Sequence, residues 1–237
     1  VDYGVGNLFS VARGLEKIGA TVEISDSPIV IKQAGSLLLP GVGSFEHGMH
    51  ELKKRGLDDA LKEYALNERP FLGICLGMQV AIIEYSRNVL GLRNSNSTEF
   101  NPNTKYPVIA LITEWSDGTG KKQKRNKNSD LGGTMRLGGQ VCKIKKPSNA
   151  FNMYKKIEII ERHRHRYEVN PDFAEDMSNS GLEVVGTSVD DKLVEMVEIK
   201  NHKWFLACQF HPEFTSNPRD GHPIFNSYIK STIENNE

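Results

Sequence analysis

Apolar and polar positions follow two alternating patterns along the first third of the chain. Some stretches carry apolar residues at the helical period, and short apolar runs lie between them. The predicted helices span residues 7–19, 45–68 with an interruption near Gly56, and 76–88; the predicted strands span residues 21–24, 36–39 and 70–74. Strands that alternate with helices are typical of a parallel sheet covered on both faces.

The rest of the chain is rich in predicted strands and ends in a helix. Strands are predicted at PVIALI (107–112), GLEVVGTS (181–188), LVEMVEI (193–199) and WFLACQF (204–210), and a helical stretch begins near Pro223. Residues 116–130 are polar, basic and aperiodic, so we predict a flexible loop there. We find no repeat and no linker. We therefore predict a single domain over residues 1–237, a three-layer α/β fold with a mostly parallel central sheet and helices on both faces.

Composition narrows the class of protein further. The 237 residues are 38% apolar and carry a formal net charge of zero, so no general attraction to nucleic acid or membrane is implied. No apolar run approaches the roughly 20 residues that cross a bilayer. The three cysteines lie far apart and form neither a CxxC pair nor a zinc spacing, which favours a reducing, cytoplasmic location. Because the chain opens on what resembles the end of a strand, we expect a few residues to precede Val1.

The segment GICLG (Gly73–Gly77) places a cysteine between two glycines, where a predicted strand meets a predicted helix. Two interpretations are open. Cys75 is either a small buried residue, as free cysteines often are, or the nucleophile of a tight strand-to-helix turn. In such a turn the glycines let strand and helix approach closely, and the helix N-terminus favours a thiolate.

A cysteine nucleophile needs a base, and the base needs an orienting group. The HPE motif follows the strand predicted over residues 204–210, so His211 is expected at the carboxyl edge of the sheet, where sites collect in open α/β folds. In extended backbone Glu213 faces the same way as His211 and can hold the imidazole in one tautomer. The alternative is a turn histidine followed by a surface charge. The conjunction of this motif with the GICLG turn and a glycine loop favours a site.

The glycine loop PGVGSF (Pro40–Phe45) also follows a buried strand and is expected at the same edge. Attack on a carbonyl creates an oxyanion, which needs preorganised N–H donors. We predict the N–H of Leu76 as one donor and an N–H of the Gly41–Gly43 segment as the other, because glycine lets a peptide turn either way.

GICLGMQ with a later HPEF is similar to the class I (triad) glutamine amidotransferases, which hydrolyse L-glutamine and pass ammonia to a synthase. Residues 1–79 resemble the glutaminase subunit of imidazole glycerol phosphate synthase, from histidine biosynthesis, through VDYGVGNLFSVARGLEKIGA, LLLPGVGSFEHGM and GICLGMQ. Residues from about 70 to 237 resemble the glutaminase domain of CTP synthase, through GICLGMQVAIIEYSRNVLGL, NSTEF, SDLGGTMRLG, ERHRHRYEVN and FLACQFHPEFTSNPRDGHPIF. The chain therefore resembles a hybrid joined near Cys75, and the family implies a flavodoxin-like fold.

The resemblance also implies roles for single residues. Cys75 would be the nucleophile, His211 the general base and then the acid to the leaving ammonia, and Glu213 the group that orients His211. The implied oxyanion hole comprises Val42, Gly43 and Leu76, with the Val42 peptide favoured in the loop. The implied glutamine-contacting positions are Gly41, Leu76, Gly77, Met78, Gln79, Glu99 and Arg166. Of these, Glu99 suits the substrate α-ammonium group and Arg166 its polar backbone end.

The implied partners are L-glutamine and a synthase that accepts ammonia. That synthase is either the CTP synthase amidoligase, which converts UTP to CTP in pyrimidine biosynthesis, or a (β/α)₈ barrel cyclase subunit. No cofactor is expected in this domain.

No metal is expected either, because His163 and His165 lack a completing carboxylate or cysteine. The run RHRHR (162–166) is too short, and too poor in aromatics, for a nucleic-acid tract. Two other functions stay open. One is a catalytically silent module, if the hybrid junction misplaces the oxyanion loop. The other is a cysteine hydrolase acting on γ-glutamyl peptides, which Glu99 and Arg166 disfavour.

Overall fold

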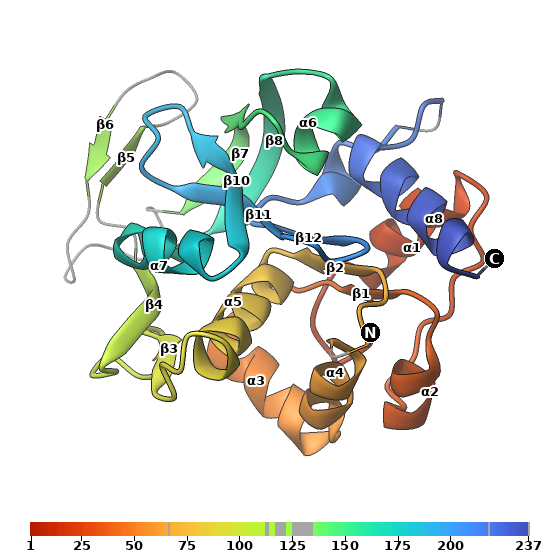
Figure 1. The fold of residues 1–237 in the computed structure, drawn as a ribbon, viewed down its shortest axis with the longest axis horizontal. Coiled ribbons are helices and arrows are strands. Elements are labelled where there is room, and N and C mark those ends of the chain that lie inside the picture. Colours follow the sequence, from red (N-terminus) through yellow and green to blue (C-terminus); the bar gives the residue numbers. More distant parts are fainter. Residues whose placement is uncertain (66, 112–113, 117–121, 125–134, 218, 237) are drawn as a thin grey trace.

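The computed structural model describes residues 1–65, 67–111, 114–116, 122–124, 135–217 and 219–236. Within them, a seven-stranded central sheet has the order β1-β2-β12-β11-β10-β7-β8 (Figure 1). Its strands are β1 (Leu37–Leu39), β2 (Phe71–Ile74), β7 (Arg136–Ile144), β8 (Glu158–His165), β10 (Leu182–Ser188), β11 (Val194–Ile199) and β12 (Phe205–Cys208).

The α/β class is confirmed, but the central sheet is mixed rather than mostly parallel. Only β1–β2 and β2–β12 pair in parallel, and the other four pairings are antiparallel. Of the three strands that pair in parallel, β1 and β2 come from the alternating first third of the sequence, whereas β12 comes from the last third. The antiparallel part lies in the second half of the chain, where β10, β11 and β12 follow one another without a crossover helix.

Helices cover both faces of the sheet, as predicted. The helices on one face are α3 (Phe45–Lys54), α4 (Leu57–Ala65) and α5 (Leu76–Asn88), with α2 (Pro28–Gln33) packed on α4; on the other face lie α1 (Leu8–Glu16), α6 (Asn149–Tyr154) and α8 (Pro223–Asn236) (Figure 1). Two hydrophobic clusters fill the two interfaces. Leu37 and Leu39 of β1 face the first cluster, and Leu38 faces the second. This alternation is the period-2 pattern of a strand buried on both sides.

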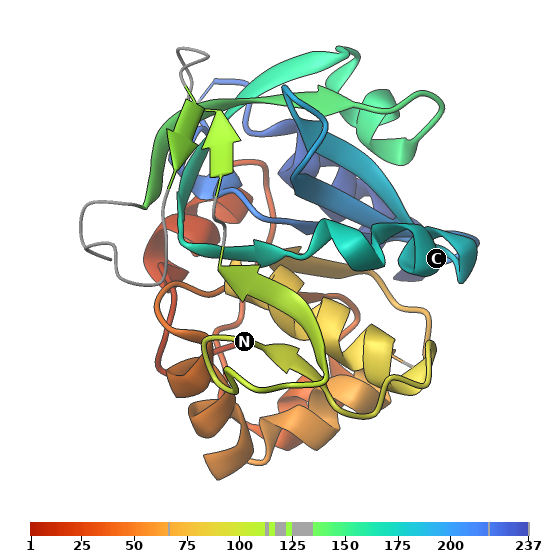
Figure 2. The same ribbon diagram turned by 90° about the vertical axis from the view of Figure 1, so that its left-hand side faces the viewer.

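Two smaller sheets lie to one side of the central sheet (Figure 2). One contains β3 (Ser95–Ser97), β4 (Tyr106–Leu111) and β9 (Tyr167–Val169), and the other contains β5 (Glu114–Ser116) and β6 (Lys122–Lys124). Most of the loop predicted over residues 116–130 lies outside the described residues. Helix α7 (Ala174–Asn179) connects β9 to β10.

One predicted strand is absent. Residues 21–24 form no strand in the structure, although they were expected to follow α1. Asp2 donates its N–H to Ser25 O, and the terminal amine of Val1 donates to Leu38 O. Single hydrogen bonds therefore connect the N-terminal segment to the segment around residue 25 and to β1. A ladder needs consecutive pairs of such bonds, which these segments lack within the described residues.

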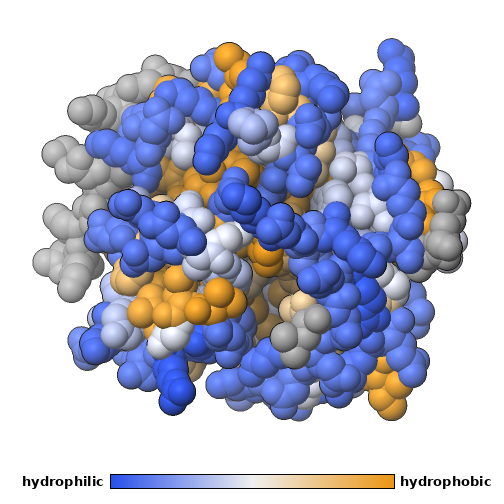
Figure 3. All heavy atoms as spheres, viewed as in Figure 1, coloured by the Kyte–Doolittle hydropathy of each residue, from blue (hydrophilic) through white to orange (hydrophobic). Residues whose placement is uncertain are grey.

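The outer surface is mostly hydrophilic with separate apolar patches on the face that Figure 3 shows. Exposed large apolar side chains occur singly on several elements, among them Phe9 on α1 and Ile160 on β8. Among the described helices, none combines the length and the apolar character that a bilayer crossing requires.

Candidate active site

Cys75 lies in the turn between β2 and α5, in a backbone conformation that is rare for a residue with a side chain. Its φ is 53° and its ψ is −103°, and its N–H donates to Cys208 O at 2.7 Å. A Cβ added to Gly77 would lie 2.0 Å from Leu39 O, so only glycine fits there. Sterically costly backbone of this kind gathers at functional sites, and here it places the thiol at the start of a helix.

His211 reaches the same edge because β12 runs parallel to β2. Cys208 pairs with Ile74 in the ladder, so both strands end together and the segments after them meet. The N–H of His211 donates to Arg162 O at 2.9 Å, which fixes the backbone at the base position. His211 Nδ1 contacts Glu213 Oε1 at 2.9 Å, and both side chains are buried.

The predicted contact between His211 and Glu213 is present, but the reason given for it was wrong. Residues Pro212–Phe214 form a 3₁₀ turn and not an extended strand. The turn brings the carboxylate back beneath the imidazole, and Pro212 is tolerated at the first position of that turn. A carboxylate on Nδ1 leaves Nε2 as the atom available for proton transfer.

The environment of His211 favours its protonated form. Burial lowers the pKa of His211, but the charge and polarity of Cys75, and then of Glu213, outweigh burial and raise it to about 10. Among the described residues, His211 Nε2 has no hydrogen-bond partner of normal geometry. Glu213 therefore holds the imidazole at Nδ1 and leaves Nε2 without a hydrogen bond among the described residues. The charge of Cys75 raises the pKa of the ring.

A second buried side chain, which the sequence analysis missed, contacts the thiol. Gln209 Nε2 lies 3.7 Å from Cys75 Sγ and donates to it. Gln79 Nε2 donates to Tyr167 O at 2.8 Å and to Gln209 Oε1 at 3.3 Å. Gln79, predicted as a substrate contact, is therefore linked to the sulfur by hydrogen bonds through Gln209. The only sequence signal for Gln209 is a polar residue within the apolar run WFLACQF.

The glycine loop lies against the elbow, as predicted. A Cβ on Gly41 would fall 2.6 Å from Leu76 Cβ, so loop and elbow are in close contact. Gly43 has φ 110°, in the region that favours glycine. Among groups that the structure describes, none accepts a hydrogen bond from the N–H of Val42 or Gly43. Leu76 is the first residue of α5, where a helical N–H has no intrahelical acceptor.

The two charged residues predicted to bind glutamine influence each other electrostatically. Burial raises the pKa of Glu99, while the hydrogen bond from the Phe45 N–H and the charge of Arg166 oppose that shift. Glu99 Oε2 also accepts the N–H of Phe45, the first residue of α3, at 2.7 Å. Met78, by contrast, is fully buried in the core, so a substrate contact from it would have to involve its backbone.

Cys142, Cys208, His163 and His165 are buried in structural surroundings. Burial raises the pKa of both the Cys142 and Cys208 thiols well above the ordinary value, whereas Cys75 keeps 4% of its surface exposed. His163 and His165 point inward, and their Nδ1 and Nε2 atoms lie 2.8 Å apart. Within the described ranges no group of three or more His, Cys, Asp or Glu side chains is arranged to hold a metal ion.

A buried ion cluster beside these histidines was also missed. The Arg136 guanidinium donates to Glu168 Oε1 at 2.7 Å and to Glu195 Oε1 at 2.8 Å, with all three side chains buried. Arg136 and Glu195 belong to the central sheet, and Glu168 belongs to β9 of the smaller sheet. The cluster therefore joins the two sheets next to Arg166.

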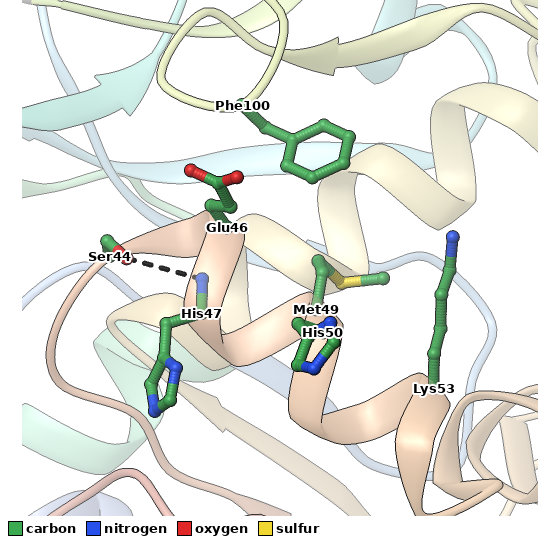
Figure 4. A pocket seen from close by; sticks show the side chains of 7 residues that line it. All are labelled: Ser44, Glu46, His47, Met49, His50, Lys53 and Phe100. Atoms are coloured by element: carbon green, nitrogen blue, oxygen red, sulfur yellow. Dashed lines mark hydrogen bonds between the residues drawn. The ribbon is translucent and has the colours of Figure 1, made fainter.

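A pocket of about 380 Å³ lies outside the glycine loop, between α3 and Phe100 (Figure 4). Ser44 caps α3 beside it, accepting the N–H of His47 at 3.2 Å. The pocket is lined by Ser44, Glu46, His47, Met49, His50, Lys53 and Phe100. Neither Cys75 nor His211 lines it, so it is distinct from the candidate active site.

Known proteins share this fold. The family model described as "Glutamine amidotransferase class-I" matches residues 1–231. The glutaminase domain of Trypanosoma brucei CTPS with bound acivicin superposes with a TM-score of 0.78 and 30% sequence identity, covering 95% of this chain and 88% of that chain. A putative GMP synthase protein from Thermoplasma acidophilum superposes with a TM-score of 0.60 and 15% identity, covering 99% of this chain and 90% of that one.

The fold, the elbow and the family match together place this chain in the class I glutamine amidotransferase family. It is accordingly an enzyme of the glutamine amidotransferase class, with the CTPS glutaminase domain among its structural relatives. The GMP synthase likeness, at 15% identity, supports the fold alone.

Proposed function

We propose that this chain hydrolyses L-glutamine to glutamate and ammonia through Cys75, His211 and Glu213. The observation that supports this most directly is the meeting of a strained elbow cysteine with an imidazole that a carboxylate holds at 2.9 Å, at one edge of the sheet. The residues come from two strands that pair in parallel but lie far apart in the chain. This arrangement is that of an activated nucleophile.

The proposed reaction proceeds in two halves. The Cys75 thiolate attacks the side-chain amide carbon of glutamine, and the oxyanion is stabilised by the N–H of Leu76 and an N–H of the Gly41–Gly43 segment. Protonated His211 gives its proton to the leaving nitrogen, ammonia departs, and a γ-glutamyl thioester remains. His211 then takes a proton from water, the resulting hydroxide attacks the thioester, and glutamate leaves as the thiolate returns.

The substrate would be held by charge at its amino-acid end. Glu99 suits the α-ammonium group, and Arg166 suits the α-carboxylate. The charge of Arg166 acts on Glu99, which supports a pair that holds the two α-groups together. A γ-glutamyl peptide keeps the same two α-groups free, so it differs from glutamine only at the γ-amide nitrogen. The close contact of Gly41 with Leu76 disfavours a silent module with a misplaced loop.

The test is glutamine hydrolysis by variants of single cysteines. Cys75→Ala is expected to abolish glutamate release, and Cys142→Ala, a matched loss of a buried thiol on β7, is expected to retain it. Because the CTPS relative was solved with acivicin, acivicin is the first probe for covalent labelling of Cys75. Normal hydrolysis by Cys75→Ala would reject the proposal. Faster turnover of γ-glutamyl peptides than of glutamine would favour the peptidase alternative.

The acceptor of the ammonia is proposed to be a CTP synthase-type ligase, which aminates UTP. The 30% identity to the CTPS glutaminase domain over 95% of this chain supports that choice. The alternative is a (β/α)₈ barrel subunit of the histidine pathway, which the motifs of residues 1–79 favour. A cytoplasmic location is proposed with it, because the three cysteines are free.

A further inference from the structure

The loop between β1 and α3 must hold its N–H groups in one direction to stabilise an oxyanion. Residues 40–44 contain two glycines, and Gly43 has a positive φ of 110°. A peptide next to glycine rotates at little steric cost, so the sequence of the loop does not itself fix which way its N–H groups point. Preorganised donors stabilise a transition state because they do not have to reorient during the reaction. Something outside the loop must therefore hold it.

Tyr3 contacts the loop at its first peptide. Its side chain is fully buried, and its hydroxyl donates to Pro40 O at 2.5 Å. A Cβ on Gly41 would lie 2.4 Å from the Tyr3 hydroxyl and 2.6 Å from Leu76 Cβ, so Gly41 is enclosed between Tyr3 and the elbow. Because the peptide unit is planar, fixing the carbonyl of Pro40 also fixes the direction of the Gly41 N–H.

The hydroxyl also lies near the thiol. Burial, and then the charge of Cys75, raises the pKa of Tyr3, so the phenol stays protonated and remains a donor. At its other end the loop is held by Glu99, which accepts the N–H of Phe45. The two contacts enclose the segment that carries Val42 and Gly43.

We propose that Tyr3 is a positioning residue for the oxyanion loop. Its hydroxyl holds the peptide between Pro40 and Gly41, so that the following N–H groups point toward the place where the substrate oxygen becomes charged. The inference rests on the proposed function for its catalytic consequence. The clamp itself, which is the hydrogen bond from the Tyr3 hydroxyl to Pro40 O and its restraint on the loop, can be measured without any activity. Among the described residues, the Tyr3 hydroxyl donates to Pro40 O of the loop, so Tyr3 acts through the loop.

The chain offers a matched control. Tyr64 on α4 is also fully buried, and its hydroxyl also donates to a proline carbonyl, Pro70 O, at 2.8 Å. That bond lies at the start of β2, the end opposite Cys75. Tyr3→Phe and Tyr64→Phe therefore remove the same kind of hydrogen bond from equally buried positions, and only the first bond touches the loop.

The experiment compares the two variants in three measurements: glutamine kcat and KM, the rate of Cys75 alkylation by iodoacetamide, and amide hydrogen exchange over residues 41–45. Tyr3→Phe is expected to lower kcat by about ten-fold or more. This is part of the roughly 10²–10³-fold decrease in kcat that follows complete loss of one oxyanion donor. KM and alkylation should change little, because neither requires a charged carbonyl oxygen. Exchange of the loop amides should become faster. Tyr64→Phe should leave kcat and loop exchange unchanged.

Three results would overturn the proposal: an unchanged kcat in Tyr3→Phe, an equal loss of kcat in both variants, or loop exchange that does not respond to Tyr3→Phe. If the wild-type chain hydrolyses no glutamine, the proposed function fails and the exchange measurement decides alone. Faster loop exchange in Tyr3→Phe only would then still support the clamp, and unchanged exchange would reject it.

Discussion

The charge of His211 depends on the residue beside it. Burial lowers the pKa of His211, and Cys75 and Glu213 raise it to about 10. Because an unfolded histidine titrates near pH 6.5, the folded chain binds more protons than the unfolded chain between that pH and about 10. The stability that His211 contributes is therefore complete below pH 6.5 and is lost as the pH rises toward 10.

We predict that Cys75→Ala lowers the pKa of His211, because Glu213 alone then offsets the effect of burial. The free energy of unfolding should accordingly depend less on pH. Imidazole NMR titration measures the first effect, and urea unfolding at pH 6, 8 and 10 measures the second. An ordinary His211 titration in the wild-type chain would contradict the arrangement described for the site.

Gln209 donates a hydrogen bond to the sulfur from a fully buried position. We predict that Gln209→Met lowers kcat by about two- to twelve-fold, the rate equivalent of one hydrogen bond of about 0.5–1.5 kcal/mol. The control is Gln140→Met on β7, a similarly buried glutamine that contacts Leu137 O and no site residue. Equal effects of the two substitutions on kcat would show that the amide of Gln209 has no special effect on the thiol.

At the scale of elements, a buried ion cluster joins the two sheets that carry the site. Arg136 of β7 binds Glu195 of β11 and Glu168 of β9, and β9 begins one residue after Arg166. Removing one partner of a buried pair leaves an uncompensated charge, which costs about 3–5 kcal/mol. Lys143 lies on the same strand and pairs with Asp191 at 2.8 Å in an exposed position, where such pairs are worth about 0–1 kcal/mol.

We predict that Arg136→Met lowers the free energy of unfolding by about 3–5 kcal/mol, whereas Lys143→Met lowers it by about 1 kcal/mol or less. Urea denaturation at pH 7 measures both. If the two substitutions cost the same, the cluster would not be the connection between the sheets that the contacts indicate.

Glu99 is assigned two functions, holding the start of α3 and binding the substrate ammonium group, and different substitutions at Glu99 should affect them differently. Its carboxylate accepts the N–H of Phe45 at 2.7 Å and is proposed to bind the substrate ammonium group. We predict that Glu99→Gln raises KM by about ten-fold or more, since a hydrogen bond to a charged group is worth about 1.5–3 kcal/mol, but largely keeps kcat because the amide oxygen still accepts from Phe45. Glu99→Ala should lower kcat as well.

The same carboxylate gives a pH dependence of defined sign. Because burial raises the pKa of Glu99, protonation on acidification should raise KM at a higher pH than an ordinary glutamate would. Steady-state kinetics of the three proteins between pH 5 and 8 measure this effect. A KM that is independent of pH in the wild-type chain and unchanged in Glu99→Gln would exclude the ammonium contact.

The elements that the sequence predicted are those in which local pattern and burial agree. Helix α5 begins and ends where it was expected, because Gly73 and Gly77 mark the turn and the apolar residues that follow are core. The antiparallel pair β7–β8 was missed because β8 buries Glu161, His163 and His165 and exposes Ile160, the reverse of the usual pattern. Contacts of Tyr3 and Gln209 depend on how distant segments meet, which no local period encodes.

On the scale of the whole molecule, the two resemblances meet in one sheet. Strand β2 lies between β1, from the part that resembles the histidine-pathway subunit, and β12, from the part that resembles the CTP synthase domain. Gly73, two residues before Cys75, pairs with both Leu39 and Ala207, so the two parts share one register next to the elbow. The geometry of the site is therefore a joint product of both parts, so it does not by itself distinguish the two proposed synthases.

That choice can be tested with each synthase supplied separately. With a CTP synthase amidoligase domain, ATP and UTP, we predict glutamine-dependent CTP that requires Cys75, while ammonia-dependent CTP forms without this chain. Because the formal net charge is zero, docking should depend only weakly on salt between 0.05 and about 0.5 M, beyond the screening of local pairs. Cys75→Ala should compete with the wild-type chain, since the variant keeps the docking surface. Glutamine-dependent product with only the (β/α)₈ barrel cyclase present would instead assign the chain to the histidine-type partner.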